Sequence, residues 1–302
     1  MKYAILLILA YSSIALCSAQ KLRNEFTYAP STEFGEQIVF QNTKDTTVNR
    51  YEKAVINGFD SKVPFYHYIN SENTNKFVLL LHGLGGSKEN WVKPTSDGKL
   101  VDSLVSLGYN VIIPDAKYHG ERSYEFNFRP AGTLPPELSR SQQDAESLCE
   151  LYSSTIKDLR ILMDYLENRY TGEKLQFDLI GYSMGGAFSL LLNAVDPRIN
   201  SVASCVPPLN RPIKEIKGFA WPNEIAEKLK DISSMYYADV QRSPVILLMG
   251  RTDYFTTVTE VNQFFDGMHI TDKKLKFYEA GHSLPPVYIN DVIEWITSHN
   301  KN

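Results

Sequence analysis

Apolar residues follow two different patterns along residues 51–299 of the chain. Continuous apolar runs such as Phe77–Leu81 are typical of strands that are buried on both faces of a parallel sheet. Between these runs lie segments whose apolar positions recur every three or four residues, which predicts helices. The pattern predicts strands at 51–57, 63–69, 77–81, 109–114, 175–181, 200–206, 245–250 and 275–280, and helices at 98–107, 147–170, 184–195, 257–268 and 286–299.

The alternation of strands and helices predicts an α/β fold with a doubly wound, mainly parallel sheet and helices on both faces. Residues 21–50 are polar and aperiodic, and we expect them only to lead into the fold. Two segments interrupt the alternation, at about 123–146 and 207–242, and the second is long enough for a small cap only. Because nothing resembling a linker divides the chain, we expect a single domain over residues 20–302.

The amino-terminal segment differs from the rest. Lys2 is followed by an almost wholly apolar run from Ile5 to Leu16, and small residues end the segment at Ala19. This is typical of a signal peptide over residues 1–19, because the run of about a dozen residues is shorter than the roughly 20 needed to span a bilayer. The segment predicts a secreted or periplasmic protein without a membrane span after its removal. Lipid anchoring through Cys17 is the alternative, which the bulk of Leu16 disfavours.

Composition narrows the possible partners only slightly. Hydrophobic residues make up 43% of the chain and charged residues 22%, which is ordinary for a globular protein. A net charge of −4 gives no reason to expect nucleic acid or an anionic membrane as partner. Removal of the leader leaves Cys149 and Cys205, whose pairing or burial as free thiols stays open. The sequence does not indicate the oligomeric state.

Gly181-Tyr182-Ser183-Met184-Gly185 is the strongest local signal for chemistry. A serine hydroxyl is a poor nucleophile unless a base accepts its proton and its oxygen stands clear of the backbone. A sharp turn from a strand into a helix exposes the oxygen, and glycines two residues before and after the serine make that turn sterically possible. Since a predicted strand precedes Ser183 and a predicted helix follows it, we predict that Ser183 is a nucleophile.

Two later strand ends carry the partners that such a serine needs. Asp253 follows the strand that ends at Gly250, and His282 follows the next predicted strand. Both lie at the edge of the sheet where open parallel sheets bind their ligands. We therefore expect His282 to accept the proton of Ser183 and Asp253 to orient the imidazole. Glu260 and Asp266 fall within the following helix and are weaker candidates.

The oxyanion of an acyl-transfer intermediate needs backbone N–H donors. We expect one donor from Met184, directly after the nucleophile. The loop His82-Gly83-Leu84-Gly85-Gly86 follows the first long buried strand, and Leu84 is the expected second donor because glycines flank it. We interpret His82 itself as structural.

Taken together, these motifs resemble the α/β-hydrolase superfamily over residues 51–299. The resemblance is carried by five stretches of the chain: His82-Gly83, Pro114-Asp115 through His119-Gly120-Glu121-Arg122-Ser123, the turn at Ser183, Gly250 to Asp253, and Gly281-His282. It implies an esterase-like serine mechanism that uses no metal and no organic cofactor. It also implies that His119 is structural and that its segment packs beside the loop of Leu84.

The sequence says less about the substrate pocket. Trp221 and Tyr236 in the second insertion are candidate substrate-binding residues, although their rings would serve equally well to attach the insertion to the body. Residues 123–146 could form another wall, and Arg122 or Arg129 could bind a substrate carboxylate. The loop after His82 lacks the HGGG form of many lipases, which disfavours a bulky hydrophobic ester.

The predicted function is that of a secreted serine hydrolase acting on a small-molecule carboxylic ester, including one attached to or released from extracellular polysaccharide. Two alternatives share the fold. A serine peptidase is disfavoured because relatives that cleave peptides usually carry a further amino-terminal domain. The short stretch between the predicted leader and the first predicted strand at 51–57 cannot supply one. A non-catalytic binding protein is disfavoured because Ser183, Asp253 and His282 are all present.

Overall fold

A computed structural model describes most of the chain. The residues that it describes are 25–30, 32–42, 51–70, 74–93, 96–172, 174–210, 212 and 218–300. The leader predicted over residues 1–19, including Cys17, lies outside the described residues. No described helix is both long and apolar enough to cross a bilayer.

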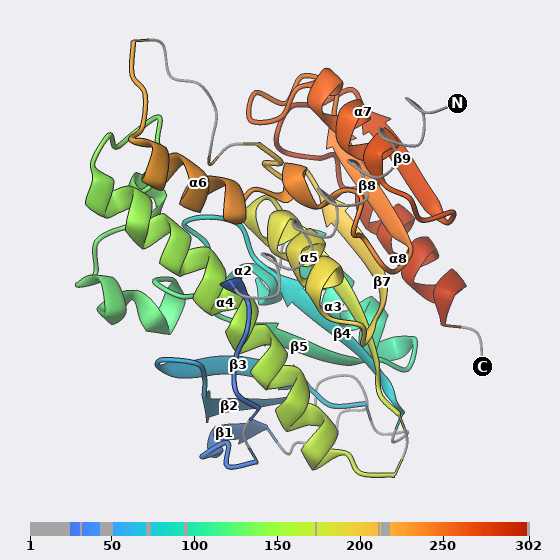
Figure 1. Ribbon diagram of the computed structural model, residues 1–302. Coiled ribbons are helices and arrows are strands. Elements are labelled where there is room, and N and C mark those ends of the chain that lie inside the picture. The colour runs from blue at the N-terminus through green and yellow to red at the C-terminus, as the bar shows by residue number, and fades with distance from the viewer. Residues whose placement is uncertain are drawn as a thin grey trace, which may run out of the picture.

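The described elements alternate much as the apolar pattern predicts (Figure 1). The strands are β1 (Gln37–Asn42), β2 (Tyr51–Asn57), β3 (Lys62–Tyr68), β4 (Lys76–Leu81), β5 (Asn110–Pro114), β6 (Gln176–Tyr182), β7 (Ile199–Cys205), β8 (Val245–Gly250) and β9 (Lys273–Tyr278). The α-helices are α2 (Glu89–Val92), α3 (Ser96–Ser106), α4 (Gln142–Arg169), α5 (Met184–Val195), α6 (Asn223–Asp231), α7 (Val258–Gly267) and α8 (Tyr288–His299). Short 3-10 helices are η1 (Gly120–Phe126), η2 (Ala131–Thr133) and η4 (Ser234–Tyr237).

All of these strands belong to one nine-stranded sheet with the order β1-β2-β3-β5-β4-β6-β7-β8-β9. The strands from β5 to β9 in this order pair in parallel, whereas β1, β2, β3 and β5 pair antiparallel. A tight turn joins β2 to β3, where the N–H of Gly58 donates to the carbonyl of Ser61 at 2.7 Å. The predicted α/β fold with a mainly parallel sheet is confirmed.

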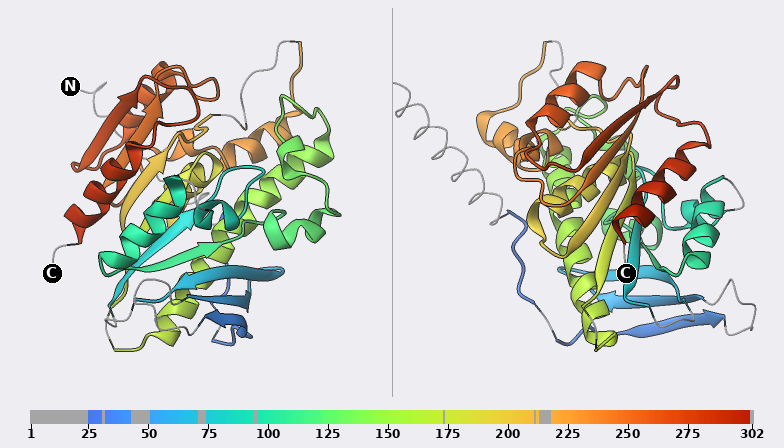
Figure 2. Two further views of the ribbon diagram at one scale, coloured as in Figure 1. Left: turned by 180° about the vertical axis from the view of Figure 1, so that it is seen from behind. Right: turned by 90° about the vertical axis from the view of Figure 1, so that its right-hand side faces the viewer.

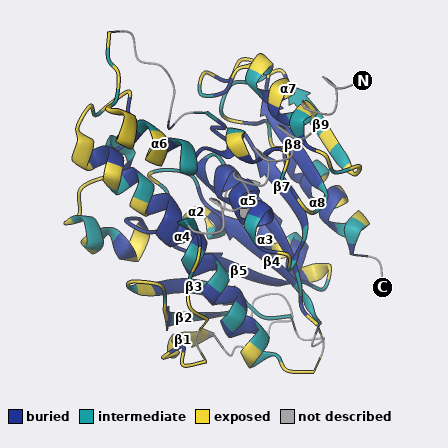
Figure 3. Cartoon of the chain, viewed as in Figure 1, coloured by how far each residue is buried: buried dark blue, intermediate teal, exposed yellow. Residues whose placement is uncertain are grey.

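Side chains of the central strands point alternately to the two faces of the sheet, so both faces need a cover. In β4, Phe77 and Leu79 belong to the apolar core under α4, α5, α6 and α7, whereas Val78 and Leu80 belong to the core under α3 and α8. Figure 2 shows the two sets of helices on opposite sides of the sheet. Figure 3 shows the central strands as buried, with exposed residues on the outer surfaces of the helices.

The amino-terminal region departs from the prediction for residues 21–50. Residues 37–42 form β1 at the edge of the sheet, with a register shift between Ile38 and Phe40. Both of those side chains are about half exposed (46% and 51%), so the strand lacks the alternation that marks a buried face. Phe26 and Phe34, by contrast, are buried in the core. Isolated apolar residues in a polar segment carry no period, which is why the pattern missed them.

The structure also decides two smaller points, the start of α4 and the state of the two cysteines. Helix α4 begins at Gln142, five residues before the predicted start, because its first turn is polar and adds nothing to the apolar period. Cys149 lies in α4 and Cys205 ends β7, and the two sulfur atoms are not joined in a disulfide bond. The disulfide that the sequence left open is therefore absent.

Candidate active site

Ser183 occupies the turn between β6 and α5, at the carboxyl end of a central strand. Its backbone has φ 55° and ψ −118°, a conformation that residues other than glycine adopt only under strain. A Cβ at Gly181 would lie 2.0 Å from the carbonyl oxygen of Gly185, and a Cβ at Gly185 would lie 2.0 Å from that of Leu81. Only glycine fits at either position, so the two glycines of the motif allow the sharp turn that presents the serine hydroxyl.

His282 and Asp253 complete a continuous chain of hydrogen bonds with this serine. The Oγ atom of Ser183 lies 2.8 Å from Nε2 of His282, and Nδ1 of the same ring lies 2.8 Å from Oδ2 of Asp253. The carboxylate is fully buried, whereas the imidazole is 19% exposed. The three residues that the sequence singled out, far apart along the chain, thus meet beyond the carboxyl ends of β6, β8 and β9.

Two further residues hold this arrangement, and sequence reasoning missed both. The Tyr182 hydroxyl accepts a hydrogen bond from the Leu284 N–H at 2.9 Å and donates to the carbonyl of His282 at 3.0 Å, so it fixes the loop that carries the imidazole. The N–H of Phe255 donates to Oδ1 of Asp253 at 2.8 Å. The sequence offers no period or motif that distinguishes these positions. Only their contacts in the folded chain reveal them.

Two buried histidines hold the loop that contains Leu84. Nε2 of His82 accepts the N–H of Ala116 at 3.1 Å, so its proton sits on Nδ1, which donates to the carbonyl of Gly83 at 2.9 Å. Nε2 of His119 accepts the N–H of Gly85 at 3.0 Å, and its Nδ1 lies 2.7 Å from the carbonyl of Lys117. The two rings therefore fix the peptide groups on both sides of Leu84.

Burial keeps both of these histidines neutral. It lowers the pKa of His82 to about 4 and the pKa of His119 to about 3. Each ring therefore keeps one nitrogen free to accept a backbone N–H over the whole neutral pH range. The hydrogen bonds of both rings go to backbone groups, which agrees with the interpretation of both as structural.

The expected oxyanion donors lie next to Ser183. Among the described residues, the N–H groups of Leu84 and Met184 have no hydrogen-bond acceptor, and both residues border the same cavity as the serine. A Cβ at Gly83 would lie 3.3 Å from that of Ser183, so the loop approaches the serine closely because a glycine stands there. The two N–H groups are thus available to a ligand at the hydroxyl.

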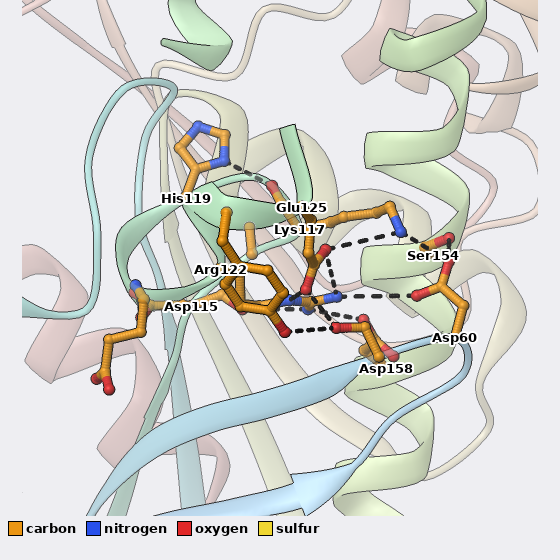
Figure 4. Close-up of polar contacts among 12 residues, drawn as sticks. Asp60, Asp115, Lys117, His119, Arg122, Glu125, Ser154 and Asp158 are labelled. Atoms are coloured by element: carbon orange, nitrogen blue, oxygen red, sulfur yellow. Dashed lines mark hydrogen bonds and ion pairs between the residues drawn. The ribbon is translucent and has the colours of Figure 1, made fainter. Parts of the chain in front are cut away.

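Buried charges hold the segment that carries His119. The carboxylate of Asp115 accepts both the backbone N–H of Lys88, at 2.8 Å, and its ammonium group, at 2.7 Å. These bonds tie the loop after β4 to the loop after β5. Figure 4 shows the adjoining cluster, in which Arg122 lies between Glu125 and Asp158 and Lys117 reaches Asp60. Since each buried charge has a partner, breaking one pair would cost more than a surface ion pair does.

Two cavities border Ser183, and they differ greatly in size. The wide cavity has a volume of about 680 Å³ and contains His282 in its wall. Its aromatic lining consists of Trp91, Tyr182, Tyr254, Phe255 and Tyr288. The narrow cavity has a volume of about 20 Å³. It is lined by Ser183, Leu84, Met184, Pro135, Pro136, Leu148, Tyr152, Pro208 and Pro212.

The candidate substrate-binding residues lie elsewhere. Neither Trp221 nor Tyr236 is among the described residues that line these two cavities. Trp221 packs edge-on against Phe219, with ring centroids 4.8 Å apart, and also contacts the core, as expected of rings that attach the insertion to the body. Tyr236 is 47% exposed. The prediction that these two side chains form the pocket is therefore not supported.

The two candidate arginines are engaged in ion pairs. Arg122 is 1% exposed and pairs with Asp158 and Glu125, and Arg129 makes a bidentate pair with Asp144. Arg122 would have to break its buried pairs to bind a substrate carboxylate, and neither arginine is among the described residues that line the two cavities beside Ser183. The insertion at 123–146 does contribute to the cavities, but through Gly132, Pro135 and Pro136 rather than through its aromatic residues.

Metal chemistry has no candidate ligands in the described part of the chain. No group of three or more His, Cys, Asp or Glu side chains there is arranged to hold a metal ion.

Comparison with known proteins identifies the family of the chain. Residues 63–285 match the profile of the dienelactone hydrolase family. The chain is 22% identical over 265 residues to Putative esterase YitV of Bacillus subtilis (strain 168), covering 79% of this chain and 96% of the relative.

Solved structures of esterases share the fold. Acetyl xylan esterase 1 from Thermoanaerobacterium sp. JW/SL YS485 superposes with a TM-score of 0.72 at 14% identity, covering 94% of each chain. The Pyrococcus furiosus esterase Pf2001 gives a TM-score of 0.62 at 21% identity, covering 90% of this chain and all (100%) of the other. At these identities the two superpositions show that the fold is the same.

Proposed function

This chain belongs to the dienelactone hydrolase family and is a carboxylic-ester hydrolase, and we propose that it acts through an acyl-enzyme on Ser183. His282 is the general base and Asp253 is the acid that orients it. The observation that carries the proposal is the unbroken hydrogen-bonded chain from the carboxylate through the imidazole to the serine hydroxyl.

The proposed reaction has two half-reactions. The Ser183 hydroxyl passes its proton to Nε2 of His282 while Oγ bonds to the ester carbonyl carbon, and the carbonyl oxygen becomes an oxyanion. The intermediate then loses the alcohol, which takes the proton back from Nε2, and the acyl group stays on Oγ. Water repeats the sequence, giving its proton to Nε2 and releasing the carboxylic acid. Asp253 stabilises the imidazolium that forms twice in the cycle.

The oxyanion is proposed to bind the N–H groups of Leu84 and Met184. In the peptide group between Gly83 and Leu84, the carbonyl and the N–H point in opposite directions. Nδ1 of His82 and the N–H of Gly86, at 3.0 Å, both donate to that carbonyl. They therefore also fix the direction in which the Leu84 N–H points. A donor fixed before the reaction needs no reorganisation when the charge develops, which is what makes such sites effective.

His119 offers a test of this arrangement that spares the reacting groups. The substitution His119→Leu removes the acceptor of the Gly85 N–H, and we expect kcat to fall by about 10- to 100-fold with little change in KM, less than the 10²- to 10³-fold cost of losing an oxyanion donor outright. His119→Gln places an amide oxygen near the position of Nε2 and should restore part of the loss. Steady-state kinetics on p-nitrophenyl acetate and the melting temperature of each variant check this. Equal damage in both variants would mean that His119 only fills space.

We also propose that the protein is exported to the periplasm or the medium. The leader-like pattern of residues 1–19 supports this, and amino-terminal sequencing of the protein recovered from cell fractions tests it. Cleavage after Ala19 is the expected result. A membrane-bound, lipid-modified Cys17 would instead favour the alternative of an anchored enzyme.

Ester hydrolysis and active-site labelling test the proposal as a whole. The purified protein should hydrolyse p-nitrophenyl acetate and react with a fluorophosphonate probe, with Ser183 as the modified residue. If the folded protein did neither, a non-catalytic binding protein on the same fold would be the better description. Cleavage of peptides in preference to every ester would favour a serine peptidase.

A further inference from the structure

The two cavities beside Ser183 correspond to the two halves of an ester, and their order follows from the position of His282. The alcohol oxygen must come within hydrogen-bond reach of Nε2 to receive its proton as it leaves. The alcohol half therefore lies on the His282 side of the serine, and the acyl half lies on the other side. This assignment rests on the proposed function, because it assumes that Ser183 and His282 react as described above.

Only the wide cavity has His282 in its wall. Leu84 borders both cavities, whereas Met184 borders only the narrow one, and the N–H groups of these two residues are the proposed oxyanion donors. A carbonyl carbon bonded to Oγ, with its oxygen toward these donors and its leaving group toward His282, directs its acyl substituent into the narrow cavity. The wide cavity is thus the alcohol site.

The narrow cavity has room for a very short acyl group. Its volume is about 20 Å³, and about 10–15 Å³ is enough to hold one water molecule. The methyl group of an acetyl ester is of this size, whereas a butyryl group adds two methylene groups. The wide cavity, at about 680 Å³, lies within the range of sites that hold drug-sized molecules.

The walls of the narrow cavity are part of the packed core. Leu148 is 4% exposed and Tyr152 is 5% exposed, and the Tyr152 ring packs edge-on against Phe188 with centroids 4.8 Å apart. Pro135 and Pro136 form another part of the wall, and their rings restrict the backbone. A longer acyl chain would have to displace these groups, and close-packed interiors resist added methylene groups.

We propose that this enzyme hydrolyses esters of very short acids, acetate above all, with bulky alcohols. An open apolar acyl groove would favour longer chains, because each buried methylene adds binding energy. The narrow cavity instead favours the shortest acyl chains, because longer ones do not fit. Leu148 is the specificity-determining residue in its wall, since it belongs to α4 and lines the narrow cavity from the packed core.

A series of p-nitrophenyl esters from acetate to octanoate tests the proposal on the wild-type enzyme. We expect kcat/KM to fall by at least about tenfold from acetate to butyrate and further with length. In a pair of acetate esters whose leaving groups have similar acidity, enlarging the alcohol from phenyl to naphthyl should change kcat/KM far less. Octanoate hydrolysed as well as acetate would overturn the proposal and leave the proposed function intact. Failure to hydrolyse any ester or to react with a fluorophosphonate would overturn the proposed function itself.

Leu148→Ala should widen the acyl site. We expect the ratio of kcat/KM for butyrate to that for acetate to rise by about tenfold or more in this variant. Leu151→Ala is the matched control, because Leu151 is equally buried in the same helix but is absent from the lining of either cavity. The ratio does not depend on the fraction of folded protein, so partial destabilisation leaves the comparison valid. A ratio that moved equally in both variants would refute the assignment of Leu148.

Discussion

Replacing Ser183 with alanine is expected to lower kcat for p-nitrophenyl acetate by about 10⁴- to 10⁶-fold. The substitution removes the oxygen that forms the acyl-enzyme, and the alanine methyl group cannot replace it. What remains is the weak catalysis that N–H donors and a bound water provide. Fluorophosphonate labelling should disappear together with turnover, because the probe reacts with the same oxygen.

The fold should tolerate this change. Alanine and serine have the same Cβ, so the strained backbone at φ 55° is no worse for alanine. The melting temperature should therefore stay within a few degrees of the wild type, as thermal unfolding followed by circular dichroism would show. Ser298→Ala in α8 is a suitable control, since that serine only bonds to a backbone carbonyl of its own helix and to a neighbouring histidine. Labelling that persisted in the Ser183 variant would identify a different nucleophile.

Replacing Asp253 with asparagine is expected to lower kcat by about 10⁴-fold with little change in KM. The carboxylate accepts the Nδ1 proton of His282 and so leaves Nε2 free to take the proton of the serine. An asparagine amide can turn its NH₂ group toward Nδ1, which favours the tautomer with the proton on Nε2. That tautomer cannot act as the base, and the imidazolium loses its buried counter-charge.

Glu260 provides the contrast for this measurement, because the sequence offered it as a weaker candidate for the same role. Its carboxylate accepts the backbone N–H of Thr257 at 2.8 Å and completes a capping box at the start of α7. Glu260→Gln should therefore cost about 1 kcal/mol or less of stability and leave kcat nearly unchanged. Measuring kcat of both variants under the same conditions decides whether Asp253 or Glu260 orients His282. A full-rate Asp253→Asn enzyme would rule out the assigned acid.

The parts of the site that a sequence can disclose are those with a local steric or topological requirement. Gly181 and Gly185 are required by the turn itself, and Asp253 and His282 follow strand ends that the topology brings to one edge. The boundaries of β8 and α5 follow in the same way from uninterrupted apolar patterns. These features depend on neighbours along the chain or on strand order.

Other parts depend on contacts between distant segments and leave no mark in any local pattern. Tyr182, for example, holds the His282 loop through the N–H of Leu284, 102 positions further along the chain. The sequence left two interpretations of Trp221 open for the same reason. An aromatic residue in an insertion serves equally well as pocket wall or as attachment, and only its position in three dimensions tells the two apart.

The bond between the Tyr182 hydroxyl and the His282 carbonyl has a consequence for how the chain acquires activity. It joins residues 100 positions apart, and the Ser183–His282 contact spans 99. Contacts of such high sequence separation are costly to form early in folding, because a long loop must close before they contribute any stability. We therefore expect the reacting groups to be brought together late on the folding pathway. Recovered turnover in a refolding experiment should report the completed fold, not a collapsed intermediate.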